Sequence, residues 1–219
     1  TNSDNFRIRK ITPPALFNLS KAIPNLDQSA IVRKLLAKSI LEKSVIVRRS
    51  YLKVINKNCV KEFAEPSFLN YYRILLNDDS NKVRKIVLEI LAKLSNFNPI
   101  AVTSITREIL MDYFFVLQNV QSIRQQAQAA EVLPNLISAS LNIVKTYSLA
   151  LIMTLQKVLS PDYTVRTFLN FIEENSVTDI QIGVINSLAI IAPHDQETVS
   201  EYSEPIIRLL CAHLHKQSR

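Results

Sequence analysis

The sequence predicts an all-α fold in which helical hairpins stack on one another. The first reason is composition: the 219 residues include a single glycine, and 47% of all residues are hydrophobic. Glycine supplies the backbone conformations that β-hairpin turns and phosphate-binding loops need, so a chain with one glycine is poorly suited to either. The second reason is that apolar residues recur at helical spacing. The third is that a short sequence motif recurs along the chain. The hydrophobic share is ample for a buried core.

The clearest helix lies in the stretch NDDSNKVRKIVLEILAKLSNFNP, residues 77–99. Its apolar residues recur three and four positions apart and form one face of a helix, whereas charged residues fall on the other face. The apolar face consists of Val83, Ile86, Val87, Ile90, Leu91 and Leu94. Asp79 or Ser80 is expected to cap the first turn, and Pro99 to prevent continuation. Residues 100–119 carry a second apolar face, which predicts a helical hairpin.

A Val-Arg pair near the start of this helix recurs and gives the period. Its arginine is Arg84; the same pair ends at Arg48, 36 positions earlier, and an Ile-Arg pair ends at Arg124, 40 positions later. A fourth copy carries Gln181 where the arginine would stand. Paired helices that repeat every ~40 to 47 residues are typical of HEAT arrays. We therefore predict a HEAT-repeat α-solenoid of four to five hairpins, in which each hairpin buries its open apolar face against its neighbours.

The whole chain, residues 1–219, is predicted to form one continuous array. Its approximate repeat units are residues 13–43, 44–77, 78–119, 120–160 and 176–215. Residues 161–175 begin with a proline and are expected to add one short helix as an insertion. In the first unit, Pro13 or Pro14 is acceptable in the first helical turn, where a missing N–H has no helical partner in any case. The chain begins at Thr1 without an initiator methionine, so we expect a piece of a longer protein.

The recurring arginines are expected to fasten neighbouring repeats. The apolar residue beside each arginine points into the stack, and the arginine can reach a carboxylate or a free carbonyl of the next repeat. Two aspartates in the turn before the helix are the expected acceptors or helix caps, and not metal ligands. The residues predicted to make these inter-repeat contacts are Arg48, Asp78, Asp79, Val83, Arg84 and Arg124. Contacts from the arginines to a ligand are the alternative interpretation.

No catalytic, cofactor-binding or metal-binding residue is predicted. Gly183 is the only glycine, so no glycine-rich phosphate loop can form, and its place in an apolar helix indicates close helix packing. His194 is expected in a turn beside Asp195 that caps the next helix. His213 and His215 lie two positions apart on a helix and diverge, so they cannot share a metal ion as residues four apart would. The segment is therefore predicted not to be an enzyme.

Charge is distributed unevenly along the chain. Residues 1–85 hold 17 Lys and Arg against 7 Asp and Glu, a net +10, and the remainder holds 9 against 12, a net −3. A basic half fits an acidic or phosphate-rich partner, but a lysine-rich solvated face is the favoured interpretation. Proteins that bind single-stranded nucleic acid pair basic residues with exposed aromatic ones, and the best aromatic cluster here fits a core stripe better. That cluster comprises Phe63, Phe68, Tyr71 and Tyr72.

The cysteines and the hydropathy of the chain bear on its compartment. Cys59 and Cys211 match no metal or redox spacing and are expected to be buried thiols in a reducing compartment. No apolar run approaches the ~18 to 20 residues that would cross a bilayer. We therefore predict no transmembrane segment.

The middle of the chain, LLNDDSNKVRKIVLEILAKLSNFNPIAV, resembles a phrase of the TOR kinases, members of the phosphatidylinositol-3-kinase-related family. That phrase combines a Leu-Asn-Asp start, an Ile-Arg helix and an Asn-Pro stop. The matching residues here are Leu76, Asn77, Asp78, Leu94, Ser95, Asn98 and Pro99. The stretch INSLAIIAPHDQETVSEYSEPIIRLLCAHLHKQS is similar to a later segment of the family's HEAT-repeat region. Residues 1–60 match only as generic repeats.

The resemblance implies that the parent chain is a serine/threonine protein kinase that controls growth in response to nutrients, with its catalytic domain outside this segment. It implies a non-catalytic scaffold that contacts a Raptor-type subunit and a second TOR copy, with an Lst8-type subunit bound elsewhere in the complex. No small-molecule ligand or cofactor is expected, and nucleic acid is not the expected partner. The implied location is cytoplasmic, with the complex peripheral at the vacuolar or lysosomal membrane. The alternative is a HEAT solenoid of another large scaffold or transport protein that binds acidic cargo or nucleic acid through its basic N-terminal half.

Overall fold

The computed structural model describes residues 5–23, 27–58, 61–119, 122–159, 174–204, 207–208 and 211. Within these residues the chain forms ten α-helices, two short 3-10 helices and no β-strand, so the predicted all-α class is confirmed. The α-helices are α1 (Phe6–Ala22), α2 (Gln28–Leu41), α3 (Val45–Lys57), α4 (Pro66–Leu76), α5 (Asn81–Leu94), α6 (Pro99–Asn119), α7 (Ile123–Ala139), α8 (Val144–Leu159), α10 (Glu174–Ile191) and α11 (Gln196–Glu201). The 3-10 helices are Lys61–Ala64 and Leu141–Ile143.

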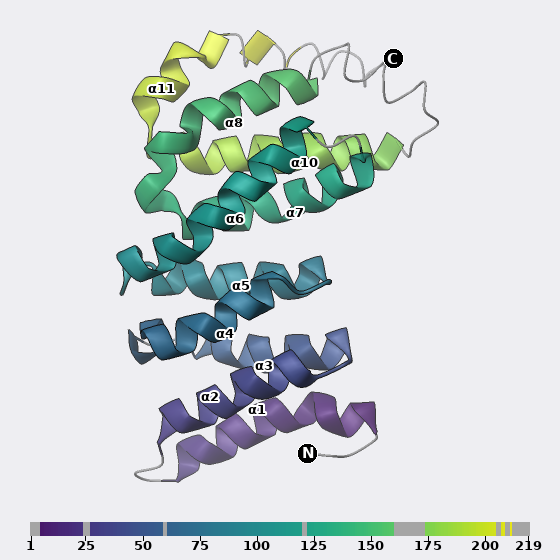
Figure 1. Cartoon of the computed structure of the whole chain (residues 1–219), viewed down its shortest axis with the longest axis vertical. Coiled ribbons are helices and arrows are strands. Elements are labelled where there is room, and N and C mark those ends of the chain that lie inside the picture. Colours follow the sequence, from purple (N-terminus) through teal and green to yellow (C-terminus); the bar gives the residue numbers. More distant parts are fainter. Residues whose placement is uncertain are drawn as a thin grey trace. The chain divides into compact units, whose positions relative to one another are not determined.

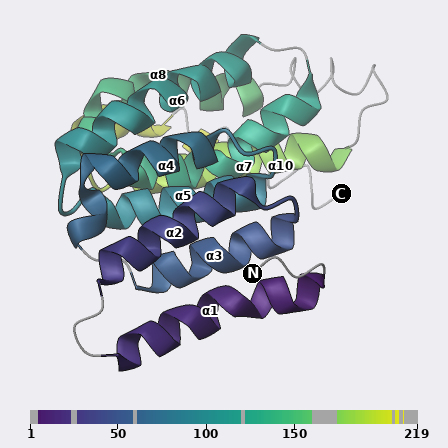
Figure 2. The same ribbon diagram turned by 60° about the horizontal axis from the view of Figure 1, so that its bottom comes forward.

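The helices group into two compact units, residues 1–105 and 106–219. In the first unit, α1, α3 and α5 lie side by side in one layer, and α2 and α4 form a second layer against them (Figure 1, Figure 2). In the second unit, α7 and α10 pack closely, and α8 contacts both α10 and α11. Each unit therefore consists of packed helical hairpins, as predicted. The boundaries of the repeats stay a prediction, and the predicted insertion lies mostly at residues 160–173, outside the described residues.

Helix α5 buries the apolar face that its sequence predicts. All six residues of that face are buried, and Leu88 is buried as well. Helical spacing places Leu88 beside the main stripe, and α5 is covered by both α3 and α4. Contacts from two neighbours widen the buried face beyond the stripe that periodicity alone indicates.

The ends of α5 are held by residues close to those expected. Ser80 is the N-cap residue, but its side chain makes no capping hydrogen bond. Instead, Asp78 Oδ1 accepts from the Ser80 backbone N–H at 2.8 Å and holds the turn that leads into the helix. Pro99 is the first residue of α6, and Asn98 Oδ1 accepts from the Ala101 N–H at 3.2 Å. The predicted stop before Pro99 is therefore also the start of the second helix of the hairpin.

Helix α1 differs from the expectation for its start. It begins at Phe6 and holds Pro13 and Pro14 in its interior, not in its first turn. Pro14 has no N–H to donate to the carbonyl of Lys10, one turn earlier. That carbonyl accepts a hydrogen bond from the hydroxyl of Ser50, in α3, at 2.5 Å. A side chain 40 positions away thus partners the carbonyl that the proline leaves free.

Gly183 lies where α10 approaches α7 at close range. A Cβ atom added to Gly183 would lie 2.2 Å from the carbonyl oxygen of Ala130 and 2.9 Å from the Ala130 Cβ. Pro134, inside α7, has no N–H to donate to that same carbonyl. Gly183 of α10, which has no Cβ, therefore lies against the Ala130 carbonyl of α7, and Pro134 cannot donate a helical hydrogen bond to that carbonyl. The prediction that Gly183 permits close helix packing is confirmed.

A helix that crosses a bilayer needs about 20 consecutive, mainly apolar residues. Among the described residues, no helix is both long enough and apolar enough to span a membrane.

Candidate functional site

Arg48 and Asp78 contact each other, and both are among the residues predicted to join neighbouring repeats. Arg48 lies in α3, and Asp78 lies in the turn between α4 and α5. Arg48 Nε and Asp78 Oδ2 are 2.7 Å apart, and Arg48 Nη2 donates to Asp78 Oδ1 at 2.9 Å. The pair is largely shielded from water, with side chains 12% and 9% exposed. The Nη2 contact is a hydrogen bond between charged groups and the Nε contact is a short ion pair, and hydrogen bonds between charged groups are stronger than those between neutral ones.

Arg48 also contacts the end of α2. Its Nη1 donates to the backbone carbonyl of Glu42 at 3.0 Å and to that of Lys43 at 2.9 Å, just beyond the last residue of the helix. Carbonyls at the end of a helix have no partner within the helix, and the helix dipole favours a cation there. A single side chain therefore connects α2, α3 and the turn before α5.

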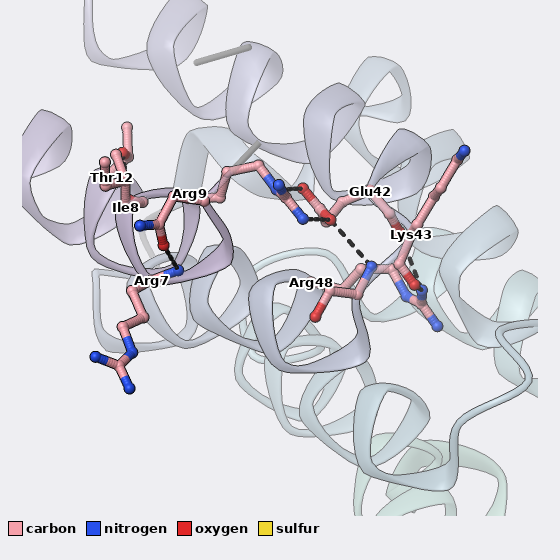
Figure 3. Close-up of polar contacts among 9 residues, drawn as sticks. Arg7, Ile8, Arg9, Thr12, Glu42, Lys43 and Arg48 are labelled. Carbon is pink, nitrogen blue, oxygen red and sulfur yellow. Dashed lines mark hydrogen bonds and ion pairs between the residues drawn. The ribbon is translucent and has the colours of Figure 1, made fainter. Parts of the chain in front are cut away.

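The same arrangement occurs one hairpin earlier, between Arg9 of α1 and Glu42 (Figure 3). Arg9 Nε donates to Glu42 Oε2 at 3.1 Å, and Arg9 Nη2 donates to Glu42 Oε1 at 3.5 Å. Glu42 Oε1 accepts from the backbone N–H of Ser44 at 3.0 Å, as Asp78 does from that of Ser80. Sequence reasoning missed this pair. The signal was an acidic residue two positions before the serine that begins the next helix.

Arg84 makes a different contact from Arg48. It follows the N-cap serine of α5 by four positions, as Arg48 follows that of α3. Its Nη2 donates to Asn81 of the same helix, and its buried Nε has no partner among the described residues. Val83 beside it is fully buried, whereas Asp79 is exposed. Of the two aspartates in this turn, the structure therefore brings only Asp78 to an arginine.

Arg124 is exposed on α7, away from the position that the earlier arginines occupy. It follows the N-cap residue Ser122 by two positions, not four, so the Ile-Arg pair does not keep the structural register of the Val-Arg pairs. The residue four positions after Ser122 is Gln126, which is buried and donates from Nε2 to the carbonyl of Leu117 at 2.9 Å. The structure thus puts Gln126, and not Arg124, at the corresponding place.

Tyr51 of α3 is buried close to the Arg9–Glu42 pair. Burial raises the pKa of the Tyr51 hydroxyl because the phenolate would lose its hydration, and the negative charge of Glu42 raises that pKa further. The positive charge of Arg9 lowers it in part. The surroundings therefore favour the neutral phenol.

Few titratable groups gather in the described part of the chain. There, no group of three or more His, Cys, Asp or Glu lies close enough to hold a metal ion. His194 is exposed, and Asp195 is the N-cap of α11 with its side chain accepting from the first turn, so its predicted capping role is confirmed. Cys211 is exposed, so the expectation that it is buried was wrong. Outside the described residues lie Cys59, His213 and His215.

The aromatic cluster of the basic half belongs to the core. Phe63, Phe68 and Tyr72 are buried, and the centroids of the two phenylalanine rings are 5.5 Å apart. Tyr71 is half-buried. The predicted core placement is confirmed for Phe63, Phe68 and Tyr72. Buried rings cannot stack on nucleic-acid bases, so this cluster gives no support to binding of single strands.

The chain has detectable sequence similarity to two known proteins. No family model matches the chain. It is 24% identical over 117 residues to the serine/threonine-protein kinase tor1 of Schizosaccharomyces pombe, a match that covers 53% of this chain and 5% of the kinase. It is 24% identical over 119 residues to the serine/threonine-protein kinase mTor of Drosophila melanogaster, covering 54% of this chain and 5% of that kinase. The similarity suggests a TOR-related region.

A TOR-related region agrees with the resemblance drawn from the sequence. Both kinases are similar to about half of this chain, and the match spans about 5% of the length of either one. The names of those two proteins describe them as serine/threonine-protein kinases. In the described residues, the site consists of contacts that join helices to one another, chiefly the Arg9–Glu42 and Arg48–Asp78 pairs.

Proposed function

We propose that the chain is a non-catalytic scaffold segment of a TOR-like serine/threonine protein kinase. The observation that carries the proposal is the similarity to two TOR kinases over about half the chain, in a protein built from packed helical hairpins. Arrays of hairpins present extended surfaces that suit the binding of other proteins. The partners we propose are a Raptor-type subunit and a second copy of the kinase, in a cytoplasmic, nutrient-responsive growth-signalling complex. The Lst8-type subunit binds elsewhere in that complex.

The arginine pairs have a structural part in this proposal. A binding surface spread over several helices keeps its shape only if the spacing of those helices is fixed. The Arg9–Glu42 pair connects α1 to the end of α2, and the Arg48–Asp78 pair connects α3 to the turn before α5. We assign to both pairs the role of fastening successive hairpins, so that removing either should alter the surface as well as the stability.

Binding and catalysis can be tested on the purified 219-residue chain. We expect saturable binding to a purified Raptor-type subunit in biolayer interferometry, and no transfer of phosphate from ATP to a Ser/Thr peptide. An immobilised α-helical protein of similar net charge serves as the control. The sequence of the complete polypeptide provides the second arm, since the proposal requires a kinase domain beyond this segment. Phosphotransfer by the chain itself, or a complete polypeptide without a kinase domain, would contradict the proposal.

A second candidate function, binding of acidic cargo or nucleic acid, is favoured by the exposed cations of the first unit. These include Arg7, Lys10, Lys21, Arg33, Lys34 and Lys38. Neutralising Z phosphates of duplex DNA makes the logarithm of affinity fall with the logarithm of salt concentration at about −0.9Z. A salt titration with a fluorescent oligonucleotide therefore separates the two functions. Tight binding with a steep slope would favour the second candidate, and negligible binding at low salt would remove it.

A further inference from the structure

Two neighbouring helices of the second unit present large apolar side chains to solvent. Met111 and Phe115 lie one turn apart on α6, and Leu149 and Met153 lie one turn apart on α8. Their exposed fractions are 51%, 63%, 45% and 58%. We call these four residues the methionine patch.

The contacts between α6 and α8 place Phe115 of one pair level with Leu149 of the other. Gln118 Nε2 donates to Thr154 Oγ1 at 3.0 Å, and the ring centroids of Phe114 and Tyr147 are 6.1 Å apart. Residues about 33 to 36 positions apart therefore lie side by side, as the neighbouring ribbons in Figure 1 show. Phe115 and Leu149 are 34 positions apart, within that range, whereas Met111 lies one turn before Phe115 and Met153 lies one turn after Leu149. The four side chains thus form two neighbouring apolar ridges that are offset by about one helical turn.

The composition of the patch is typical of a binding surface. Single exposed hydrophobic residues are common on protein surfaces, but contiguous apolar patches mark interaction sites. The chain has only two methionines, and both are in this patch. Methionine is flexible and polarisable, so a surface built with it can adapt to the shape of a partner.

The area and charge of the patch indicate what covers it. Four side chains of roughly 200 Å² each, about half exposed, present on the order of 400 Å². A stable dimer needs about 800 Å² from each partner, so the patch alone suits a single helix better than a second copy of the chain. Glu108 and Asp112 are exposed on α6 along the edge of the patch away from α8. The exposed cations Arg107, one turn before Met111, and Lys157, one turn after Met153, lie at the ends of the two ridges and not along that edge. An acidic edge favours a basic partner.

We propose that the methionine patch docks an amphipathic helix of a partner protein. The helix places apolar residues at positions i, i+4 and i+7 on the two ridges, as in other helix-docking surfaces. Lysine or arginine residues on its flank face Glu108 and Asp112. The proposal rests on the scaffold function proposed above and names the surface and the kind of partner that it uses.

Methionine methyl groups provide a direct reporter of binding, because both methionines lie in the patch. The 219-residue chain is labelled with ¹³C at the methionine methyl groups and titrated with synthetic peptides of about 18 residues that form amphipathic helices. One peptide has leucine anchors and a lysine flank, the second has the same anchors and a glutamate flank, and the third is a scramble of the first. We expect saturable shifts of both resonances with the first peptide, at least 5-fold weaker binding of the second, and none of the third.

Substitutions then test whether the patch itself is the binding surface. The double variant Phe115→Asp with Leu149→Asp should weaken binding of the lysine-flanked peptide at least 10-fold and leave both methionine reporters in place. Ile182→Asp is the matched control, since Ile182 is equally exposed on α10 of the same unit, and it should leave affinity unchanged. Circular dichroism and thermal unfolding of each variant show whether it folds.

Several outcomes would overturn the proposal. Absence of methyl shifts at millimolar peptide, or equal affinity in a folded double variant, would show that the patch docks no helix. A dimer in sedimentation equilibrium that the double variant abolishes would assign the patch to a second copy. Saturable shifts with a peptide of residues 161–175 would assign it to the chain's own sequence. A complete polypeptide without a kinase domain would refute the TOR-like parent and leave helix docking standing, so the two failures are distinguishable.

Discussion

The two compact units are built from the same kind of helical hairpin, but different contacts join their helices. In the first unit, arginine side chains reach acidic residues in the turn before the next helix, as Arg48 reaches Asp78. In the second, Gln126 takes the place of the arginine and donates to a backbone carbonyl, and Gly183 lets α10 approach α7 closely. Charged side chains bridge helices across a polar turn, whereas a missing side chain lets two backbones meet. One repeated architecture therefore accommodates two ways of fixing helix spacing.

The difference follows from a short sequence pattern. Where an arginine makes an ion pair with the turn, the acidic residue stands two positions before the N-cap serine, as Glu42 does before Ser44. Two positions before Ser122, the N-cap of α7, the sequence has Val120. Position 120 therefore offers no carboxylate to an arginine at position 126. The residue at position 126 is a neutral glutamine, which is consistent with the lack of an acidic partner. The charge pattern of the first unit thus ends where the acidic residue is missing.

Truncation of the apolar core should have the largest effect and should be similar in the two units. Leu91 in α5 and Leu136 in α7 are both fully buried. Replacing either with alanine removes packed methyl groups and leaves a cavity, so we expect each change to lower the free energy of unfolding by ~2 to 5 kcal/mol. Urea denaturation followed by circular dichroism measures it. Lys82→Ala, at an exposed position of α5, is the control and should stay within ~0.5 kcal/mol. Equally small effects of all three changes would undermine the assigned faces.

Gly183→Ala should destabilise the second unit specifically. The added Cβ would lie 2.2 Å from a backbone oxygen of α7, so the two helices must move apart. Overpacking of this kind costs ~1 to 3 kcal/mol. Hydrogen exchange measured by mass spectrometry should show faster exchange in α7 and α10 than in the parent chain, with the first unit unchanged. Ile182→Ala, at the exposed neighbouring position, is the control. Unchanged protection of α7 in Gly183→Ala would show that the contact is looser than the structure has it.

The fold class and the packing of single helices could be predicted from the sequence because they depend on local spacing. The apolar stripe of α5 and the role of Gly183 follow from which residues lie on one face of a helix. The start of α1 could not be predicted, because Pro14 is tolerated in the helix interior through the Ser50 hydroxyl of another helix. That partner is 40 positions away in the sequence. Sequence rules for proline consider only neighbouring residues and therefore cannot predict this contact.

The candidate site could be predicted from the sequence only in part. Which residues form its contacts depends on how many positions each one lies after the start of its helix. Counting from one Val-Arg pair to the next placed Arg124 with the earlier arginines. Counting from the N-cap serine puts Gln126 there instead, and it also singles out Glu42 as a counterpart of Asp78. The arginine that contacts Glu42 lies 33 positions before it, in another helix. Pairing across hairpins requires knowledge of which helices stack.

Removing Arg48 tests whether the charged contacts matter to the first unit. Arg48→Ala leaves the Asp78 carboxylate largely shielded and without its guanidinium, so we expect a loss of ~1.5 to 3 kcal/mol in the free energy of unfolding. Arg124→Ala, at an exposed arginine, is the matched control and should stay within ~0.5 kcal/mol. A double-mutant cycle with Asp78→Ala isolates the pair. Strict additivity of the two substitutions would show that the ion pair contributes nothing to stability.

Alkaline pH should produce the smallest effect, through Tyr51 beside the charged contacts of the first unit. Burial and the charge of Glu42 raise the pKa of Tyr51 in the folded chain, whereas in the unfolded chain it titrates near ~10. Below pH ~10 the hydroxyl is neutral in both states and its contribution is fully present. As pH rises further, the unfolded chain loses this proton first, so stability falls until the folded pKa is passed. Urea denaturation between pH 8 and 11 should therefore show a steeper decline in the parent chain than in Tyr51→Phe. Parallel curves would mean that the folded chain ionises Tyr51 as readily as the unfolded one.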